Sequence, residues 1–98
     1  MREWEEVREE LLRDPEVREA YDARVVERAL ARAMIEHRLA KQVTQKELAG
    51  KMKMPQGNLS RLESGTLLPT IATLRKAAQE LNVPLEIRFG DQVISINK

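Results

Sequence analysis

Residues 44–64 read TQKELAGKMKMPQGNLSRLES, and this stretch predicts two short helices joined by a tight turn. Thr44 stands three residues before Glu47, which is the spacing of a capping box at the start of a helix. The apolar residues that follow recur at helical spacing, so both helices are expected to share one small core. The expected core residues are Leu48, Ala49, Met52, Met54 and Leu59.

The second helix is expected to run from Pro55 to Ser64, because proline is favoured at the first helical position, where no amide hydrogen is left unpaired. Gly65 then ends the helix. With Leu59 and Leu62 turned inward, the residues on the outer side or near the leading end are Gln56, Gly57, Asn58, Ser60 and Arg61. Glutamine and arginine can each form two hydrogen bonds with a base, and helix N-terminal amides suit phosphate. The pattern therefore predicts a helix that reads the major groove of DNA.

Between residues 35 and 85, a set of residues stands at the fixed spacing of one known type of domain. They are Thr44, Gln45, Leu48, Ala49, Leu59, Ser60, Arg61, Glu63, Ser64, Gly65, Pro69, Leu74, Ala78, Leu81 and Val83. This segment resembles the helix-turn-helix domain of the Xre and phage-repressor superfamily. The resemblance implies that Gln45 binds a phosphate and that Arg38 pairs with Glu63 to brace two helices. The full set of expected DNA contacts is Gln45, Lys46, Lys53, Gln56, Gly57, Asn58, Ser60 and Arg61.

Three positions depart from the superfamily pattern. Gln42 and Lys53 replace turn glycines, and Pro55 replaces the usual serine or threonine cap. The missing cap oxygen removes one acceptor for the amides at the helix start, whereas Lys53 adds positive charge where phosphate would approach.

The composition of the 98 residues indicates one domain and excludes several other classes. There is no cysteine, and His37 is the single histidine, so we expect no metal site, no cofactor and a surface position for His37. No nucleophile with a base and no phosphate loop stands at usable spacing, which argues against an enzyme. Without an apolar run of membrane-span length or a signal peptide, we expect a cytoplasmic protein that has no membrane contact.

The net charge of +1 conceals a strong asymmetry along the chain. Residues 1–22 hold four arginines against nine acids, a net charge of −5, and residues 23–98 hold thirteen basic against seven acidic residues, a net charge of +6. The larger, basic part therefore has the charge expected of a nucleic-acid-binding region.

A helical extension is expected over residues 1–23. Its first helix ends at the Asp14-Pro15-Glu16 triplet, which also starts a long helix from Pro15 to about Lys41. In the first helix the apolar stripe is Trp4, Val7, Leu11 and Leu12, of which Trp4, Val7 and Leu11 are candidate partner-binding residues. On the long helix, Val17, Tyr21, Val25 and Ala29 are expected to lie on one side. Ile35 and Leu39 are expected to belong to the core of the repressor-like domain. Packing on its own domain and partner binding both remain open for the extension.

The segment after the two short helices predicts one more helix and a hairpin. Thr70 is expected to cap a helix through Asn82 whose core residues are Ile71, Leu74, Ala77, Ala78 and Leu81. A turn at Gly90-Asp91 would pair Ile87 with Ile94 and Leu85 with Ile96 in a hairpin over residues 85–98. Because an isolated hairpin is marginal in water, it is expected either to cover its own domain or to pair with a second copy, which makes it a candidate dimerisation element.

The predicted fold is mainly α, with a five- to six-helix repressor-like domain over residues 24–84 between the N-terminal extension and the C-terminal strand or hairpin. The order of LLRDPEVREAYD, the repressor segment and LNVPLEIRFG resembles HigA-type antitoxins. That resemblance implies a homodimer that binds a palindromic operator, represses its own operon and neutralises a RelE-like or HigB-like mRNA-cleaving toxin. Two alternatives stay open: a stand-alone or phage-type repressor without a toxin, and a protein-interaction module with the same fold.

Overall fold

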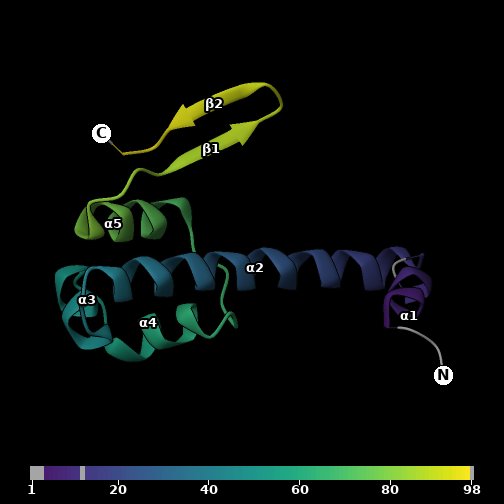
Figure 1. Ribbon diagram of the computed structural model, residues 1–98, viewed down its shortest axis with the longest axis horizontal. Helices are drawn as coiled ribbons and strands as arrows, with labels where there is room; N and C mark the ends of the chain where they lie inside the picture. The colour runs from purple at the N-terminus through teal and green to yellow at the C-terminus, as the bar shows by residue number, and fades with distance from the viewer. Residues whose placement is uncertain (1–3, 12, 98) are drawn as a thin grey trace.

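The computed structural model describes residues 4–11 and 13–97, a part of the chain that contains five α-helices and one β-hairpin (Figure 1). The elements are α1 (Trp4–Leu11), α2 (Pro15–Ala40), α3 (Gln45–Lys51), α4 (Gln56–Glu63), α5 (Ile71–Leu81), β1 (Glu86–Phe89) and β2 (Gln92–Ser95). The expected fold, mainly helical with a C-terminal hairpin, is confirmed.

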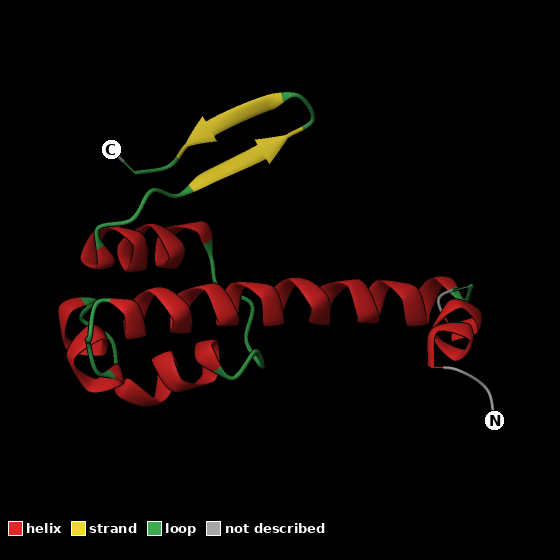
Figure 2. Cartoon of the chain, in the orientation of Figure 1, coloured by secondary structure: helices red, strands yellow, loops and turns green. Residues whose placement is uncertain are grey.

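Helix α2 is the longest element of the fold. Asp14 caps it by accepting the Glu16 N–H at 2.9 Å, and Pro15 occupies the first turn, as the sequence predicts. Its 26 residues make a helix of about 39 Å. The C-terminal half packs against α4 and α5, whereas the N-terminal half extends away from them toward α1 (Figures 1 and 2).

The core lies between the C-terminal half of α2 and the three shorter helices. Its buried residues are Met34, Leu48, Ala49, Met52, Leu59, Leu62, Ala77 and Leu81, with Val43, Met54, Leu74 and Val83 packed around them. Of the five residues that the sequence assigned to the core of the two short helices, four are buried in it, and Met54 packs against it. The core is aliphatic and small, so the hydrophobic contribution of each of these side chains, about 1.5–3 kcal/mol, is a large part of the net stability.

Two of the expected core assignments are wrong. Leu39 is 60% exposed, and the helix instead buries Ala31 and Met34, with Ile35 only half-buried. Ile71, at the start of α5, is 55% exposed. In both helices the apolar stripe is wider than the contact, because α2 packs against α4 and α5, and α5 packs against α2 and α3, without being surrounded by them.

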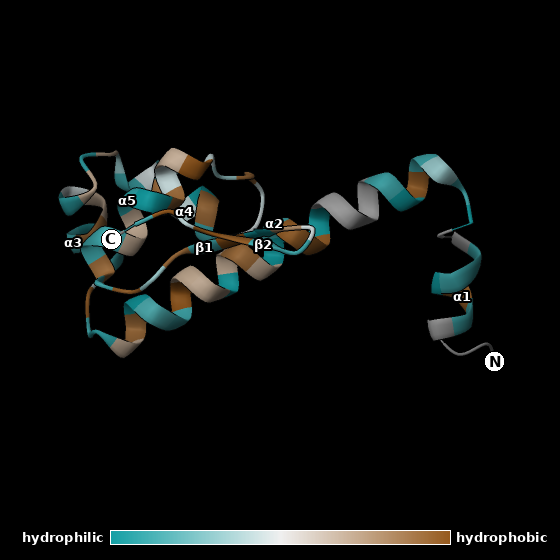
Figure 3. Cartoon of the chain, turned by 90° about the horizontal axis from the view of Figure 1, so that it is seen from above, coloured by the Kyte–Doolittle hydropathy of each residue, from teal (hydrophilic) through white to brown (hydrophobic). Residues whose placement is uncertain are grey.

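The projecting half of α2 has no apolar neighbour to cover it in the described part of the chain. Val17 is 38% exposed and Val25 is 45% exposed, and Ala29 is exposed as well. Viewed from above, hydrophilic and apolar segments alternate along α2 (Figure 3). Of the remaining extension residues, Val7 is half-buried, Leu12 lies outside the described residues, and the side chains of Trp4, Leu11 and Tyr21 lie outside the described part.

The hairpin has the predicted register. Ile87 pairs with Ile94, and the Ile96 N–H donates to the Leu85 carbonyl at 2.9 Å. Gly90 takes the first turn position with φ +64°, the left-handed conformation that glycine adopts most readily. Asn97 ties the base of the hairpin to the chain by accepting the Leu85 N–H and by donating to the Val83 carbonyl at 2.8 Å.

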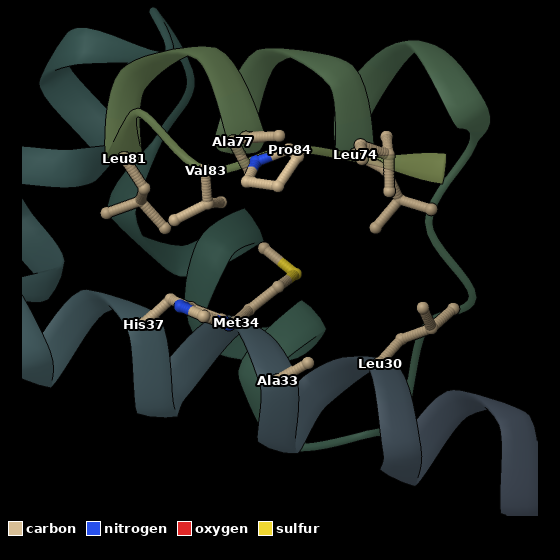
Figure 4. A pocket seen from close by; sticks show the side chains of 11 residues that line it. Leu30, Ala33, Met34, His37, Leu74, Ala77, Leu81, Val83 and Pro84 are labelled. Carbon is tan, nitrogen blue, oxygen red and sulfur yellow. The ribbon is translucent and has the colours of Figure 1, made fainter. Parts of the chain in front are cut away.

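An apolar groove of about 150 Å³ separates α2 from α5. Leu30 and Met34 of α2 face Leu74 and Leu81 of α5 across it, and His37 lies at its rim (Figure 4). His37 is exposed, as expected. In Figure 1, α5 and the hairpin lie on one side of α2 and α4 lies on the other.

Candidate nucleic-acid interface

The turn between α3 and α4 depends on one residue in a left-handed conformation. Lys53 has φ +55°, and the Met54 N–H donates to the Ala49 carbonyl at 3.0 Å to close the end of α3. Gln42, in the turn between α2 and α3, has φ +57°. Both departures from the glycine pattern therefore stand at left-handed positions, where a side chain costs about 1–2 kcal/mol.

Helix α4 begins one residue later than predicted, because Pro55 is the N-cap residue and not the first helical residue. Its φ of −61° and ψ of 141° are extended, and it makes no side-chain cap hydrogen bond. Among the described residues, no acceptor bonds the N–H groups of Gln56 and Gly57. Since free amides at a helix N-terminus bind anions, this end of α4 is open to a phosphate.

The outer face of α4 carries all five polar positions that the sequence places there. The exposed residues are Gln56, Gly57, Asn58, Ser60 and Arg61, and Lys46 and Lys53 are exposed beside them. Leu59, Leu62 and Glu63 form the buried face. The eight-residue helix is thus polar where it meets solvent, and its buried face is apolar except for Glu63.

Behind α4 lies the ion pair that the family resemblance implies. The Arg38 Nε donates to Glu63 Oε2 at 2.8 Å, and Arg38 Nη2 donates to Glu63 Oε1 at 2.9 Å. The third donor, Nη1, binds the Val43 carbonyl at 3.0 Å. The side chains are 12% and 4% exposed, so this two-pronged pair joins α2 to α4 largely out of water.

A chain of hydrogen bonds leads from this pair to the outer surface. The Gln45 Nε2 donates to Glu63 Oε1 at 3.2 Å, and the Gln56 Nε2 donates to Gln45 Oε1 at 3.4 Å. Gln45 and Gln56 are the first residues of α3 and α4, and their side chains meet where the two helices begin. The sequence pattern did not reveal these two contacts, because they join residues 18 and 11 positions apart.

These hydrogen bonds leave the Gln56 side chain able to contact a base. Within the described residues, no group donates to the side-chain oxygen of Gln56, and one of the two hydrogens on its side-chain nitrogen forms no hydrogen bond. One acceptor and one donor on the same side-chain amide are what a paired contact with adenine requires. Because the other hydrogen is bound to Gln45, the amide is oriented before any base arrives.

The opposite end of α4 is closed by its own backbone. Gly65 has φ +75°, and the Thr66 N–H and the Ser64 hydroxyl both donate to the Arg61 carbonyl, at 3.4 Å and 2.8 Å. The backbone of Arg61 is therefore fixed, whereas its side chain is exposed. The motif holds two candidate base-reading side chains, Gln56 and Arg61, on one rigid helix.

The described part of the chain shows neither a membrane helix nor a metal site. None of its helices is long and apolar enough to cross a membrane, and no group of three or more His, Cys, Asp or Glu residues there could hold a metal ion.

Comparison with known proteins agrees with this geometry. Residues 34–87 match the HTH_3 model, described as helix-turn-helix. The fold is similar to that of an HTH_3 family transcriptional regulator from Vibrio cholerae, with 24% sequence identity and a TM-score of 0.59. That similarity covers 62% of this chain and 34% of the regulator, about a third of its length. No curated protein gives a significant match. The chain belongs to the HTH_3 helix-turn-helix family.

Proposed function

We propose that this chain is a sequence-specific transcriptional repressor that inserts α4 into the major groove of an operator. The observation that carries the proposal is the oriented amide of Gln56, which stands at the open end of α4 and is held by Gln45. The acceptor and the remaining donor of this exposed amide are open to solvent, and together they match the donor and acceptor that adenine presents in the major groove.

The exposed residues divide into base-reading and phosphate-binding roles. Gln56 is placed for adenine and Arg61 for guanine, each through two hydrogen bonds. The residues for the sugar-phosphate backbone are Gln45, Lys46, Lys53, Asn58 and Ser60, together with the free amide of Gly57. Gly57 also permits close approach, because it has no side chain, and the fold itself does not require glycine here, since a Cβ at this position would have no protein atom within 4 Å.

The test is selection of duplexes from a pool with a randomised centre by the purified protein. A repressor is expected to enrich a palindrome, and Gln56→Ala is expected to lose one base preference in each half-site while overall binding falls by about 1–3 kcal/mol. Asn58→Ala is the matched control and is expected to lower affinity without changing the enriched sequence. Weak, salt-labile binding with no enriched sequence would instead identify a protein-interaction module.

The repressor is proposed to act as a homodimer through the hairpin. Ile87, Phe89 and Ile94 lie on one face of the two strands, and Phe89 is 78% exposed. Two copies that pack these faces together would cover apolar surface on both, as a two-fold interface requires. Recognition helices of such dimers are spaced about 34 Å apart, one turn of DNA.

A toxin-neutralising role is the finer part of the proposal and is supported by the N-terminal half of the molecule. Helix α1 and the start of α2 extend away from the core, and residues 1–22 carry a net charge of −5 (Figure 1). Val17 and Val25 are exposed on this extension. A surface that combines negative charge with exposed apolar side chains suits a basic protein partner such as a RelE-like toxin.

Co-purification with the product of an adjoining reading frame tests the antitoxin role. The complex is expected to form, to stop mRNA cleavage by the partner, and to weaken in Glu6→Gln/Glu9→Gln, which removes two exposed charges of α1. Glu80→Gln/Glu86→Gln removes the same charge far from α1 and is expected to leave the complex intact. A repressor that retains operator binding and has no such partner would be the stand-alone type.

A further inference from the structure

Three arginines form a stripe along α2 that the helix-turn-helix motif does not include. Arg24, Arg28 and Arg32 are exposed and stand four residues apart. This spacing places them within about 80° of arc and spreads them over about 12 Å of helix. Within the described residues, none of the three guanidinium groups forms an ion pair.

The stripe lies beside the C-terminal end of α4. A Cβ built on Gly65, directly after α4, would lie 3.3 Å from Arg28 Cγ. Arg28 and Arg32 line a cleft with Glu63 and Ser64, the last residues of that helix and its cap. Glu36 also lines this cleft, and Glu63 is already paired with Arg38, so Arg28 and Arg32 face one remaining acid and the local balance stays positive.

The two ends of α4 differ in the groups that could bind phosphate. Residues 65–70 contain no charged side chain, so the one basic group that α4 and this segment place on the C-terminal side is Arg61, which is proposed above to read bases. The N-terminal side has Lys53 and the free amides of Gln56 and Gly57. Because a major groove about 12 Å wide is bounded by a phosphate backbone on each side, a helix inserted in it meets phosphates at both ends.

We propose that Arg24, Arg28 and Arg32 bind the phosphate backbone on the C-terminal side of α4 and extend the DNA footprint beyond the helix-turn-helix motif. The proposal rests on the function proposed above and adds a second anchoring surface to it. The arginines are held on one continuous helix with the Arg38 that is paired with Glu63, so their position relative to α4 is fixed. Such contacts set the register of the protein on DNA without reading sequence.

The test compares two variants that lose the same charge from different sides of the molecule. Arg24→Gln/Arg28→Gln shortens the stripe, and Arg75→Gln/Lys76→Gln removes two exposed charges from α5, on the other side of α2 (Figure 1). Both keep long polar side chains on a helix surface, and thermal unfolding checks that both fold. The probe is the duplex that the wild-type protein enriches from the randomised pool, extended by ten base pairs on each side.

For each protein, log K is measured against the logarithm of the salt concentration. The stripe variant is expected to flatten the slope by about 1.8, because each lost phosphate contact accounts for about 0.9. The α5 variant is expected to retain the wild-type slope. The stripe variant is also expected to lose hydroxyl-radical protection on the flanking backbone while the enriched sequence stays the same.

Equal slopes for the two variants, with unchanged protection, would overturn the stripe and leave the proposed repressor intact. An unchanged DNA slope together with an altered sedimentation coefficient would assign the arginines to a protein contact, such as the acidic residues 1–22 of a second copy, and would also overturn the proposal. A wild-type protein that enriches no duplex would overturn both this inference and the proposed function.

Discussion

Glu63 of α4 accepts two hydrogen bonds from Arg38 of α2, at 2.8 Å and 2.9 Å, while only 4% of its side chain is exposed. The same carboxylate also accepts from Gln45 at 3.2 Å, and Gln45 accepts from Gln56. One buried charge therefore braces the fold and also holds Gln45, which binds the leading residue of α4, the helix proposed to enter DNA. Stability and the proposed DNA recognition are therefore coupled through Glu63.

Glu63→Ala is expected to lower the free energy of unfolding by about 3–5 kcal/mol, because it leaves the largely buried Arg38 without its partner. Urea denaturation measures this loss. Glu80→Ala, an exposed acid on α5, is the control and is expected to change stability by no more than about 0.5 kcal/mol.

Replacing both charges separates the cost of an unpaired charge from the value of the pair. Arg38→Met/Glu63→Leu is expected to recover most of the stability that Glu63→Ala loses. It is also expected to keep a lower operator affinity, since Gln45 loses its anchor. A double variant as unstable as Glu63→Ala would contradict this account of the pair.

Arg61→Ala and Lys53→Ala are expected to weaken DNA binding in different ways. Arg61→Ala is expected to cost about 1–3 kcal/mol on the operator and to relax sequence choice, because its exposed side chain is proposed to read bases. Lys53→Ala is expected to weaken all duplexes alike and to flatten the salt slope by about 1. Titrations on operator and random DNA measure both, and equal losses on the two duplexes for Arg61→Ala would refute its base-reading role.

Gln42→Gly is expected to stabilise the fold by about 0.5–1 kcal/mol, since φ is +57° at this position and glycine adopts that conformation without the steric cost of a Cβ. Gly65→Ala is the reverse experiment. At φ +75°, with Arg28 Cγ 3.3 Å from the added Cβ, it is expected to destabilise. Chemical denaturation of both variants checks the signs, and a destabilised Gln42→Gly would show that the Gln42 side chain supports the turn.

Phe89→Ser is expected to raise the dimer dissociation constant at least tenfold, or about 1.4 kcal/mol, because a two-fold interface buries the residue twice. With Phe89 78% exposed, little of its side chain supports its own subunit. Sedimentation equilibrium measures the change, with Val93→Ser on the opposite face of the hairpin as control. A wild-type protein that sediments as a monomer with and without DNA would rule out the hairpin dimer.

The sequence by itself determined the features that depend on neighbouring residues. The capping box of Thr44 and Glu47, the Thr70 cap of α5 and the hairpin register at Gly90 all follow from groups at most a few residues apart. In each case a short side chain or a glycine satisfies a local backbone requirement, and no distant segment is needed to decide the outcome. The core of α3 and α4 was predictable for the same reason, since their apolar residues recur within a single short motif.

Only the tertiary structure decided which side of a long helix is buried and which polar groups meet. Residues of α2 could face any direction by pattern alone, and packing against α4 and α5 selected Met34 and the Arg38 pair while leaving Leu39 60% exposed. The contacts from Glu63 through Gln45 to Gln56 likewise depend on how two helices cross. Burial and long-range hydrogen bonds are properties of the partners that surround a residue, and those partners come from distant parts of the chain.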